Sequence, residues 1–119
     1  MDLNKWAKEI HENAVAHGWW ESDRPLPEVL MLIVSELSEA LEEARAGRPM
    51  VWHSVPGNIP YSEDVVYANM KPEGIAVEVI DALIRILDWC GKEGLDVEAL
   101  VREKHEYNKA RPYKHGKIF

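Results

Sequence analysis

Residues 72–91 constrain the fold of this chain more than any other segment, because they predict a helix that is apolar on most of its sides. The apolar residues of this segment are Ile75, Val77, Val79, Ile80, Leu83, Ile84, Ile86, Leu87 and Trp89. A helix with such a pattern is buried on more than one face. In a chain of 119 residues, this requires a central position or burial at a subunit interface.

Three other segments repeat apolar residues at helical spacing, which predicts helices over residues 3–17, 27–46 and 97–109. Glycine or proline follows each of them, and Asp96 is a suitable N-cap for the last one. No segment alternates as a strand would. The sequence therefore predicts an all-α fold, a four-helix bundle that forms one domain over residues 1–119.

Residues 47–71 have no clear periodicity and contain several prolines and glycines, so we expect a long loop insertion between the second and third helices. A short hairpin or a helical turn within it is also compatible with the sequence. Loops of this length in small domains are often lids or binding loops. Residues 111–119 are expected to form a basic tail.

The net charge of −7 argues against nucleic acid as a bulk partner. An anionic substrate would need a metal ion or a local basic patch to approach such a surface. Cys90 is the only cysteine, which excludes an intramolecular disulfide and fits a reducing, cytoplasmic location. The longest apolar run, residues 29–34, is too short to span a membrane, and we expect neither membrane association nor export.

Two pairs of acidic residues, each three positions apart, are the strongest indication of a functional site. Glu36 and Glu39 belong to the second expected helix, and Glu78 and Asp81 to the third. Residues three apart lie on one helical face, so two facing pairs would bring four carboxylates together. Such a group is unfavourable without cations, and magnesium, with manganese as a possible substitute, prefers oxygen ligands.

Two simpler explanations remain open for these acids. They could form a solvated acidic surface, or Asp81 could be held by a salt bridge to Arg85, one turn further along the helix. Glu78 and Asp81 nevertheless interrupt a segment that is otherwise expected to be buried. No acidic residue has a histidine three positions later, which argues against a di-iron carboxylate bundle.

The last expected helix changes from apolar to cationic along its inner stripe. Val97, Leu100 and Val101 are followed at helical spacing by Lys104, Asn108 and Arg111, and then by Lys114 and His115. Arginine offers a bidentate fork and lysine a point charge, so this set could bind phosphate groups. The alternative is that these cations stabilise a helix C-terminus and a solvated tail.

Five tryptophans are many for this length. Trp6 and Trp89 fit the apolar stripes of helices and are expected in the core. Trp19 and Trp20 precede the second helix, and Trp52 lies in the long loop. Each of these three could stack on a nucleobase, or could instead cover the core or an interface.

The chain resembles the MazG-like all-α nucleoside triphosphate pyrophosphohydrolases. The segments Ser-Glu-Leu-Ser-Glu at 35–39 and Glu-Val-Ile-Asp at 78–81 resemble the Glu-x-x-Glu and Glu-x-x-Asp motifs of that family. Residues 104–117 resemble the family's Lys…Asn…Arg-Pro…His-Gly-Lys ending. The resemblance covers the last three expected helices, although the distance between Glu39 and Glu78 is longer than is usual in the family.

The resemblance implies a fold that assembles as dimers or tetramers and hydrolyses a nucleoside triphosphate to the monophosphate and pyrophosphate. Glu36, Glu39, Glu78 and Asp81 would hold magnesium, with Glu43 as a further ligand or a residue supporting the ligands, and Glu39 or Glu36 would orient the attacking water. Three alternatives stay open: a narrow-substrate relative acting on dUTP, dCTP or phosphoribosyl-ATP, a non-catalytic module that binds nucleotide or protein, and a purely structural bundle.

Overall fold

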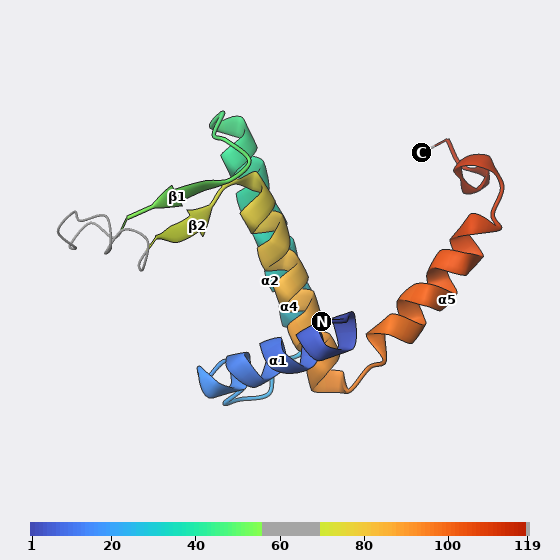
Figure 1. Cartoon of the computed structure of the whole chain (residues 1–119), viewed down its shortest axis with the longest axis horizontal. Coiled ribbons are helices and arrows are strands. Elements are labelled where there is room, and N and C mark those ends of the chain that lie inside the picture. The colour runs from blue at the N-terminus through green and yellow to red at the C-terminus, as the bar shows by residue number, and fades with distance from the viewer. Residues whose placement is uncertain (56–69, 119) are drawn as a thin grey trace. The chain divides into compact units, whose positions relative to one another are not determined.

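The computed structural model describes residues 1–55 and 70–118, apart from the side chain of His115. Within these residues the chain forms four α-helices, one short 3-10 helix and two short strands (Figure 1). The elements are α1 (Leu3–Ala16), α2 (Leu26–Arg45), β1 (Trp52–Ser54), β2 (Lys71–Glu73), α4 (Ile75–Glu93), α5 (Val97–Lys109) and η1 (Tyr113–Gly116). The predicted all-α class is confirmed. Among the described residues, no helix combines the length and apolar character needed to cross a bilayer.

The predicted boundaries of α4 were wrong at both ends. Pro72 does not start the helix but lies in β2, and α4 begins after Gly74, whose φ of 115° is open mainly to glycine. Gly91 does not end the helix. The helix continues to Glu93 and stops before Gly94, whose φ is 66°. The other helices agree with the prediction to within one residue at each end, and Asp96 caps α5 by accepting from the Ala99 amide.

Near its two ends, the segment predicted as a long loop forms two short strands that pair as an antiparallel ribbon. In this ribbon β1 pairs with β2, with Trp52 opposite Glu73 and Ser54 opposite Lys71. The hairpin alternative for this segment is therefore correct at its two ends. Residues 56–69, the middle of the expected insertion, lie outside the described residues.

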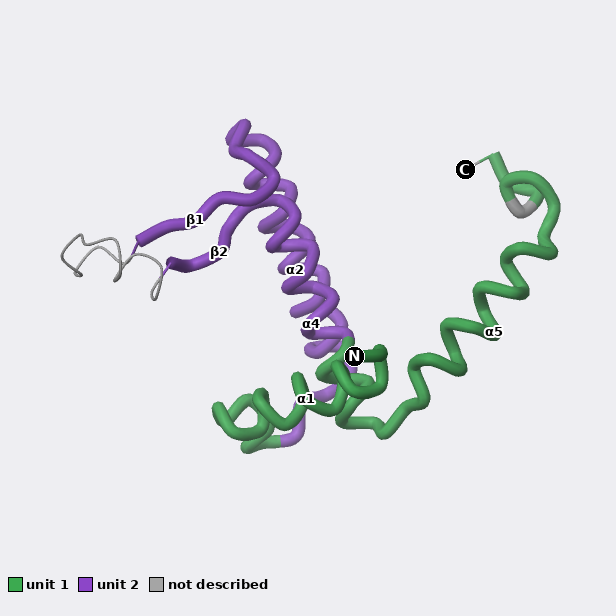
Figure 2. Tube along the Cα trace, viewed as in Figure 1, with its two compact units in different colours: residues 1–22, 87–119 green, residues 23–86 purple. Residues whose placement is uncertain are grey.

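The chain divides into two compact units, which Figure 2 shows in different colours. The terminal unit comprises residues 1–22 and 87–119, and the central unit comprises residues 23–86. Helix α4 is shared, because its first part belongs to the central unit and its last part to the terminal unit. The expectation of one four-helix bundle in a single domain stays a prediction.

The terminal unit has a small apolar core formed by Ala7, Leu87, Cys90 and Val97. Around it, Leu3, Ile10, Trp89 and Leu95 are partly buried, so the prediction for Trp89 is confirmed. Trp6, in contrast, was predicted in the core and is exposed. Leu100 and Val101 are also about half exposed, so the stripe of α5 that was expected to face inward is buried only at Val97.

The central unit consists of α2, the first part of α4 and the ribbon. Arg85 pairs with Glu36 and Glu78 bonds to Glu39, so the two helices lie side by side and antiparallel (Figure 1). The segment before β1 is fixed to the start of α4 by a backbone hydrogen bond from Ala76 to the Met50 carbonyl, and the Glu78 amide donates to the Gly74 carbonyl in the first turn of the helix. These bonds determine where Glu78 lies at the beginning of α4.

Replacing Gly74 by alanine should destabilise the central unit strongly. A Cβ at Gly74 would lie 2.4 Å from the Met50 carbonyl oxygen and 2.9 Å from that of Pro49, and neither backbone atom can move without disturbing the ribbon. We expect a loss of about 2–4 kcal/mol in the free energy of unfolding, measured by urea denaturation. Gly47→Ala is the matched control, because Gly47 also has a positive φ but no atom within 4 Å of the added Cβ. Equal losses in the two variants would contradict the steric argument.

Candidate functional site

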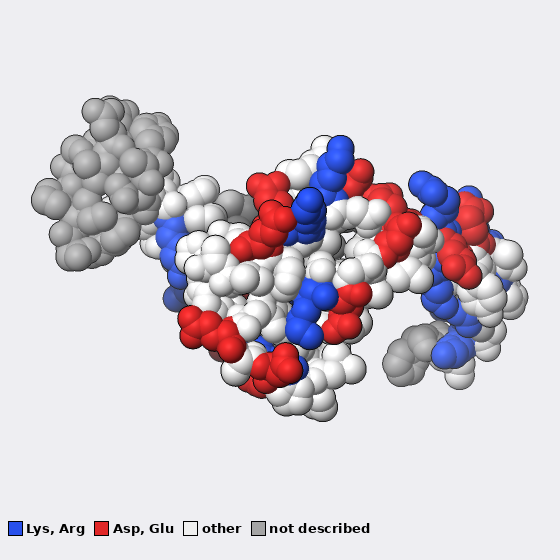
Figure 3. All heavy atoms as spheres, turned by 90° about the horizontal axis from the view of Figure 1, so that it is seen from below, with Lys and Arg blue, Asp and Glu red and all other residues white. Residues whose placement is uncertain are grey.

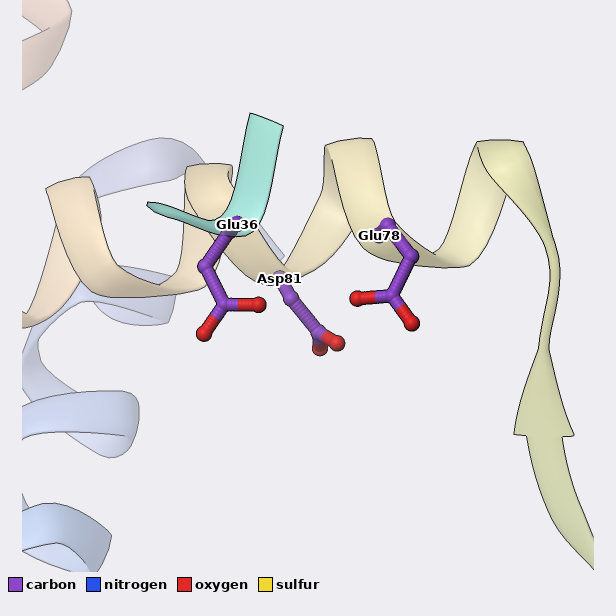
Figure 4. A group of neighbouring side chains, drawn as sticks. All are labelled: Glu36, Glu78 and Asp81. Atoms are coloured by element: carbon purple, nitrogen blue, oxygen red, sulfur yellow. The ribbon is translucent and has the colours of Figure 1, made fainter. Parts of the chain in front are cut away.

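Helices α2 and α4 bring the predicted metal ligands of the two motifs together. One carboxylate oxygen each from Glu36, Glu78 and Asp81 lies within 4.8 Å of the others (Figure 4). The three side chains point to the same side of the two helices (Figure 4). Glu39 joins them by a hydrogen bond between its side chain and that of Glu78. We call Glu36, Glu39, Glu78 and Asp81 the acid cluster.

Glu78 carries the largest electrostatic penalty in the acid cluster. Its burial, its hydrogen bond to Glu39 and the negative charges of Glu39, Asp81 and Glu36 raise the pKa of Glu78 to about 7. Its Oε2 atom is buried and has no hydrogen-bond partner among the described residues. A buried carboxylate oxygen without a donor is rare in folded proteins and requires an explanation, such as a bound ion.

Asp81 is influenced by both negatively and positively charged neighbours. Burial and the Glu36 carboxylate raise the pKa of Asp81, whereas a hydrogen bond from Glu78 and the charges of Arg85 and Lys71 lower it, with a net increase. Two acids in the cluster therefore hold their protons more strongly than isolated carboxyl groups do. A divalent cation would reverse this preference, because it favours the ionised carboxylates.

Arg85 contacts a different acid from the one that the sequence indicated. Its Nε donates to Glu36 Oε1 at 2.7 Å, so the salt bridge links α4 to α2, whereas the expected partner was Asp81 on the same helix. Arg85 influences Asp81 only through its charge. The alternative of a salt bridge between Asp81 and Arg85 is therefore wrong, because Arg85 pairs with Glu36, and this pair does not explain Glu78.

The donor set of the acid cluster suits magnesium or manganese. All of its ligands are carboxylate oxygens, which hard divalent cations prefer, and the buried Glu78 Oε2 offers an acceptor without a donor. Glu36, Glu78 and Asp81 would hold the ion, with Glu39 beside them. Within the described residues, this is the one group of at least three such side chains with a suitable spacing.

Glu43, one turn beyond Glu39 on α2, has a separate role. It is buried, and its carboxylate accepts from Arg48 Nη1 at 3.2 Å and from Trp52 Nε1 at 3.3 Å. The Arg48 guanidinium also lies over the Trp52 ring, 5.4 Å from its centroid. Glu43 therefore connects α2 to the ribbon and is not part of the acid cluster, and these contacts favour a structural role for Trp52.

The predicted phosphate-binding residues belong to the terminal unit, whereas the acid cluster belongs to the central unit. Lys104 and Arg111 both lie against the ring of Tyr107, with their charged groups 4.8 Å and 5.6 Å from its centroid. Asn108 is half-buried and Lys114 is exposed, while the side chain of His115 lies outside the described residues. On the face shown in Figure 3, α5 and the C-terminal turn carry basic side chains interspersed with acidic ones.

The two tryptophans that precede α2 differ in their surroundings. Trp19 is exposed. Trp20 donates from Nε1 to Asp88 at 2.9 Å, and Lys92 Nζ lies 5.2 Å from the centroid of its ring. Base stacking by either tryptophan stays a prediction, although the contacts of Trp20 favour a structural role.

Sequence reasoning did not identify the polar cluster around Asp88. This carboxylate accepts from Trp20 and contacts His11 Nδ1 at 2.8 Å, and thereby joins α1 and the loop that follows it to α4. The available signal was the same as for Glu78, because Asp88 is an acid within an apolar helix. Its partners could not be identified, because they lie 68 and 77 positions away in the sequence.

Comparisons of the chain with known protein families, with curated proteins and with solved structures found no match. The assignment of a function therefore depends on the acid cluster and on the motifs that resemble the MazG-like family.

The raised pKa of Glu78 predicts a specific dependence of stability on pH when divalent cations are absent. A carboxyl group that holds its proton more strongly in the folded state stabilises the fold fully below its unfolded pKa of 4.5, and this contribution is lost as the pH rises through about 7. Thermal unfolding in the presence of chelator should show this loss, up to about 1 kcal/mol per pH unit.

Glu78→Gln removes the titrating group while keeping its shape, so its unfolding should show a smaller decrease in stability between pH 5 and pH 8. Added magnesium should raise the melting temperature of the wild type more at pH 8 than at pH 5, because fewer protons then compete with the ion. An identical pH dependence in the variant and the wild type would show that Glu78 is not the group responsible.

Proposed function

We propose that this protein is a magnesium-dependent hydrolase that cleaves a nucleoside or deoxynucleoside triphosphate into the monophosphate and pyrophosphate. The observation that supports this most is the buried, unpartnered Glu78 Oε2 within a group of four acids from two helices. This group consists of the same residues that match the Glu-x-x-Glu and Glu-x-x-Asp motifs of the MazG-like family.

In the proposed reaction, water attacks the α-phosphorus and the bond from this phosphorus to the oxygen bridging to the β-phosphate breaks. The oxygen of the water becomes part of the monophosphate, the water loses a proton, and pyrophosphate leaves. When bound, magnesium would lower the pKa of a water molecule and neutralise charge on the triphosphate. Manganese would be a possible substitute.

The residues of the acid cluster would have different tasks in this reaction. Glu36, Glu78 and Asp81, whose oxygens lie closest together, would bind the ion. Glu39 is exposed and bonded to Glu78, so it is the acid best placed to orient the water and accept its proton. Binding of the substrate by Lys104, Asn108, Arg111, Lys114 and His115 remains an expectation from the family resemblance.

The acid cluster does not specify the base or the sugar of the substrate. A narrow preference for dUTP, dCTP or phosphoribosyl-ATP is compatible with the same four acids, and a panel of nucleotides would distinguish these. A non-catalytic module would bind nucleotide with magnesium but release no pyrophosphate. A purely structural bundle would show no magnesium-dependent change in melting temperature.

Removing Glu39 or Glu78 should abolish the reaction. We expect Glu39→Gln and Glu78→Gln each to lower kcat by about 10²-fold or more, because the first loses the proton acceptor and the second a metal ligand. Pyrophosphate release would be measured on the nucleotide panel with magnesium and with chelator. Glu42→Gln is the matched control, since Glu42 is an exposed acid of the same helix that lies 3.8 Å from Arg45. Full activity in Glu78→Gln would refute the assignment.

Assembly into a homo-oligomer is the second part of the proposal. Leu30, Val34, Leu37 and Leu41 on α2 follow a spacing of four, three and four residues, which is the pattern of a helix seam. On α4, Val79, Leu83 and Ile86 form a similar stripe. These seven side chains, which we call the aliphatic face, are between 40% and 58% exposed. At 100° per residue, the stripe on α2 lies about 130° from Glu36 and the stripe on α4 about 110° from Glu78, in the same rotational sense, so both lie on one side of the antiparallel pair.

A second copy of the chain is the partner that fits the aliphatic face. The face consists of aliphatic side chains that are about half exposed on two antiparallel helices, so the same face of another copy could interdigitate with it. Two copies would then form a four-helix layer in which these aliphatic side chains are buried.

Leu37→Glu should therefore convert the assembly to monomers, because it places a charge in the middle of the aliphatic face. Analytical ultracentrifugation should show a rise in the dissociation constant of about 100-fold or more. Met31→Glu is the control, since Met31 is equally apolar and 63% exposed but lies about 100° away from the stripe on α2. A wild-type protein that is monomeric at high concentration would contradict the proposed assembly.

A further inference from the structure

The acid cluster lies beside two cations of its own unit. Arg85 is one turn beyond Asp81 on α4, and Lys71 is at the start of β2. Both lower the pKa of Asp81 through their charge, so both act on the cluster directly. A site that only had to hold a bare cation would be weakened by positive charges that act on its ligands.

Arg85 uses only part of its binding capacity. Its Nε donates to Glu36 Oε1 at 2.7 Å, and no hydrogen bond from its two terminal nitrogens to another described residue is present. The side chain is 33% exposed, against 12% for Glu36. The guanidinium is therefore held in place by one bond, while the planar fork that suits phosphate oxygens stays available.

Lys71 is the more exposed of the two cations. Its side chain is 72% exposed, and its Nζ lies 3.7 Å from Glu73 Oε1, a long and solvent-exposed pair of low strength. A flexible ammonium of this kind can reorient toward an anion at small cost. Lys71 and Arg85 thus differ in geometry but carry the same charge beside the same acids.

We infer that Arg85 and Lys71 bind the phosphate groups of a metal-complexed polyphosphate, so that the central unit recognises the anionic part of the complex by itself. This inference depends on the proposed function for the metal-binding role of the acid cluster. Arg85 is the specific contact and Lys71 an auxiliary one. The site thereby favours a divalent cation that arrives with its phosphate over the free ion.

Two binding measurements with opposite expected signs test this inference. The first probe is inorganic pyrophosphate with magnesium, titrated calorimetrically into the full chain. Arg85→Gln should weaken its binding by about tenfold or more, Arg85→Lys by less, and Lys71→Gln by about threefold. Arg45→Gln is the control, because Arg45 is an exposed arginine of the same unit that is paired with Glu42, and it should change the affinity by less than about twofold.

The second probe is Mn²⁺ alone. Arg85→Gln should bind it at least as tightly as the wild type, and up to about tenfold more tightly, because a competing positive charge is removed. Weaker binding of both probes would mean that Arg85 only holds Glu36 in place, which would overturn the inference. Unchanged binding of magnesium pyrophosphate in Arg85→Gln would also overturn it.

Failure of this inference can be distinguished from failure of the proposed function. If the wild type binds magnesium pyrophosphate but hydrolyses no nucleotide, the hydrolase proposal fails and the binding comparison still decides the role of Arg85. If the wild type is active and Arg85→Gln changes neither KM nor pyrophosphate affinity, the inference alone fails. Should Arg85→Gln not fold, wild-type affinity in both Arg85→Lys and Lys71→Gln would overturn it.

Discussion

Mutual repulsion among the carboxylates between α2 and α4 is the main electrostatic constraint on the central unit. On α2, Val29, Ala40 and Glu43 are buried and Glu36 pairs with Arg85 of α4, whereas Leu30, Val34, Leu37 and Leu41 are about half exposed. Helices normally bury their most apolar side against a neighbour. The acids of α2 therefore share its buried side with apolar residues, while four of its aliphatic side chains remain about half exposed.

Two acids on the inner face of this pair illustrate the difference between a structural carboxylate and a site. Glu43 is satisfied by Arg48 and Trp52, so its charge is compensated within the fold. Glu78 has other acids as its closest partners, and one of its oxygens has no donor among the described residues. The carboxylate of Glu43 thus has donors for both of its oxygens, whereas that of Glu78 lacks a donor for one.

The sequence predicted those features that depend on local spacing. The four helices and the convergence of Glu36, Glu39, Glu78 and Asp81 follow from periods of three to four residues, which the chain itself carries. The start of α4 at Ile75 and the choice of Glu36 as the partner of Arg85 depend on ribbon pairing and on helix register. Those are relations between distant segments, and a single sequence contains little information about them.

The ribbon has a consequence for how this site can diversify. Because β1 and β2 pair with each other, and the Met50 carbonyl before β1 accepts from Ala76 of α4, the two ends of the intervening segment are held together independently of its length. Closing a longer loop between fixed ends costs little additional entropy. Natural variation or protein engineering can therefore exchange the connection between Ser54 and Lys71 as a cassette, while the acids keep their mutual register.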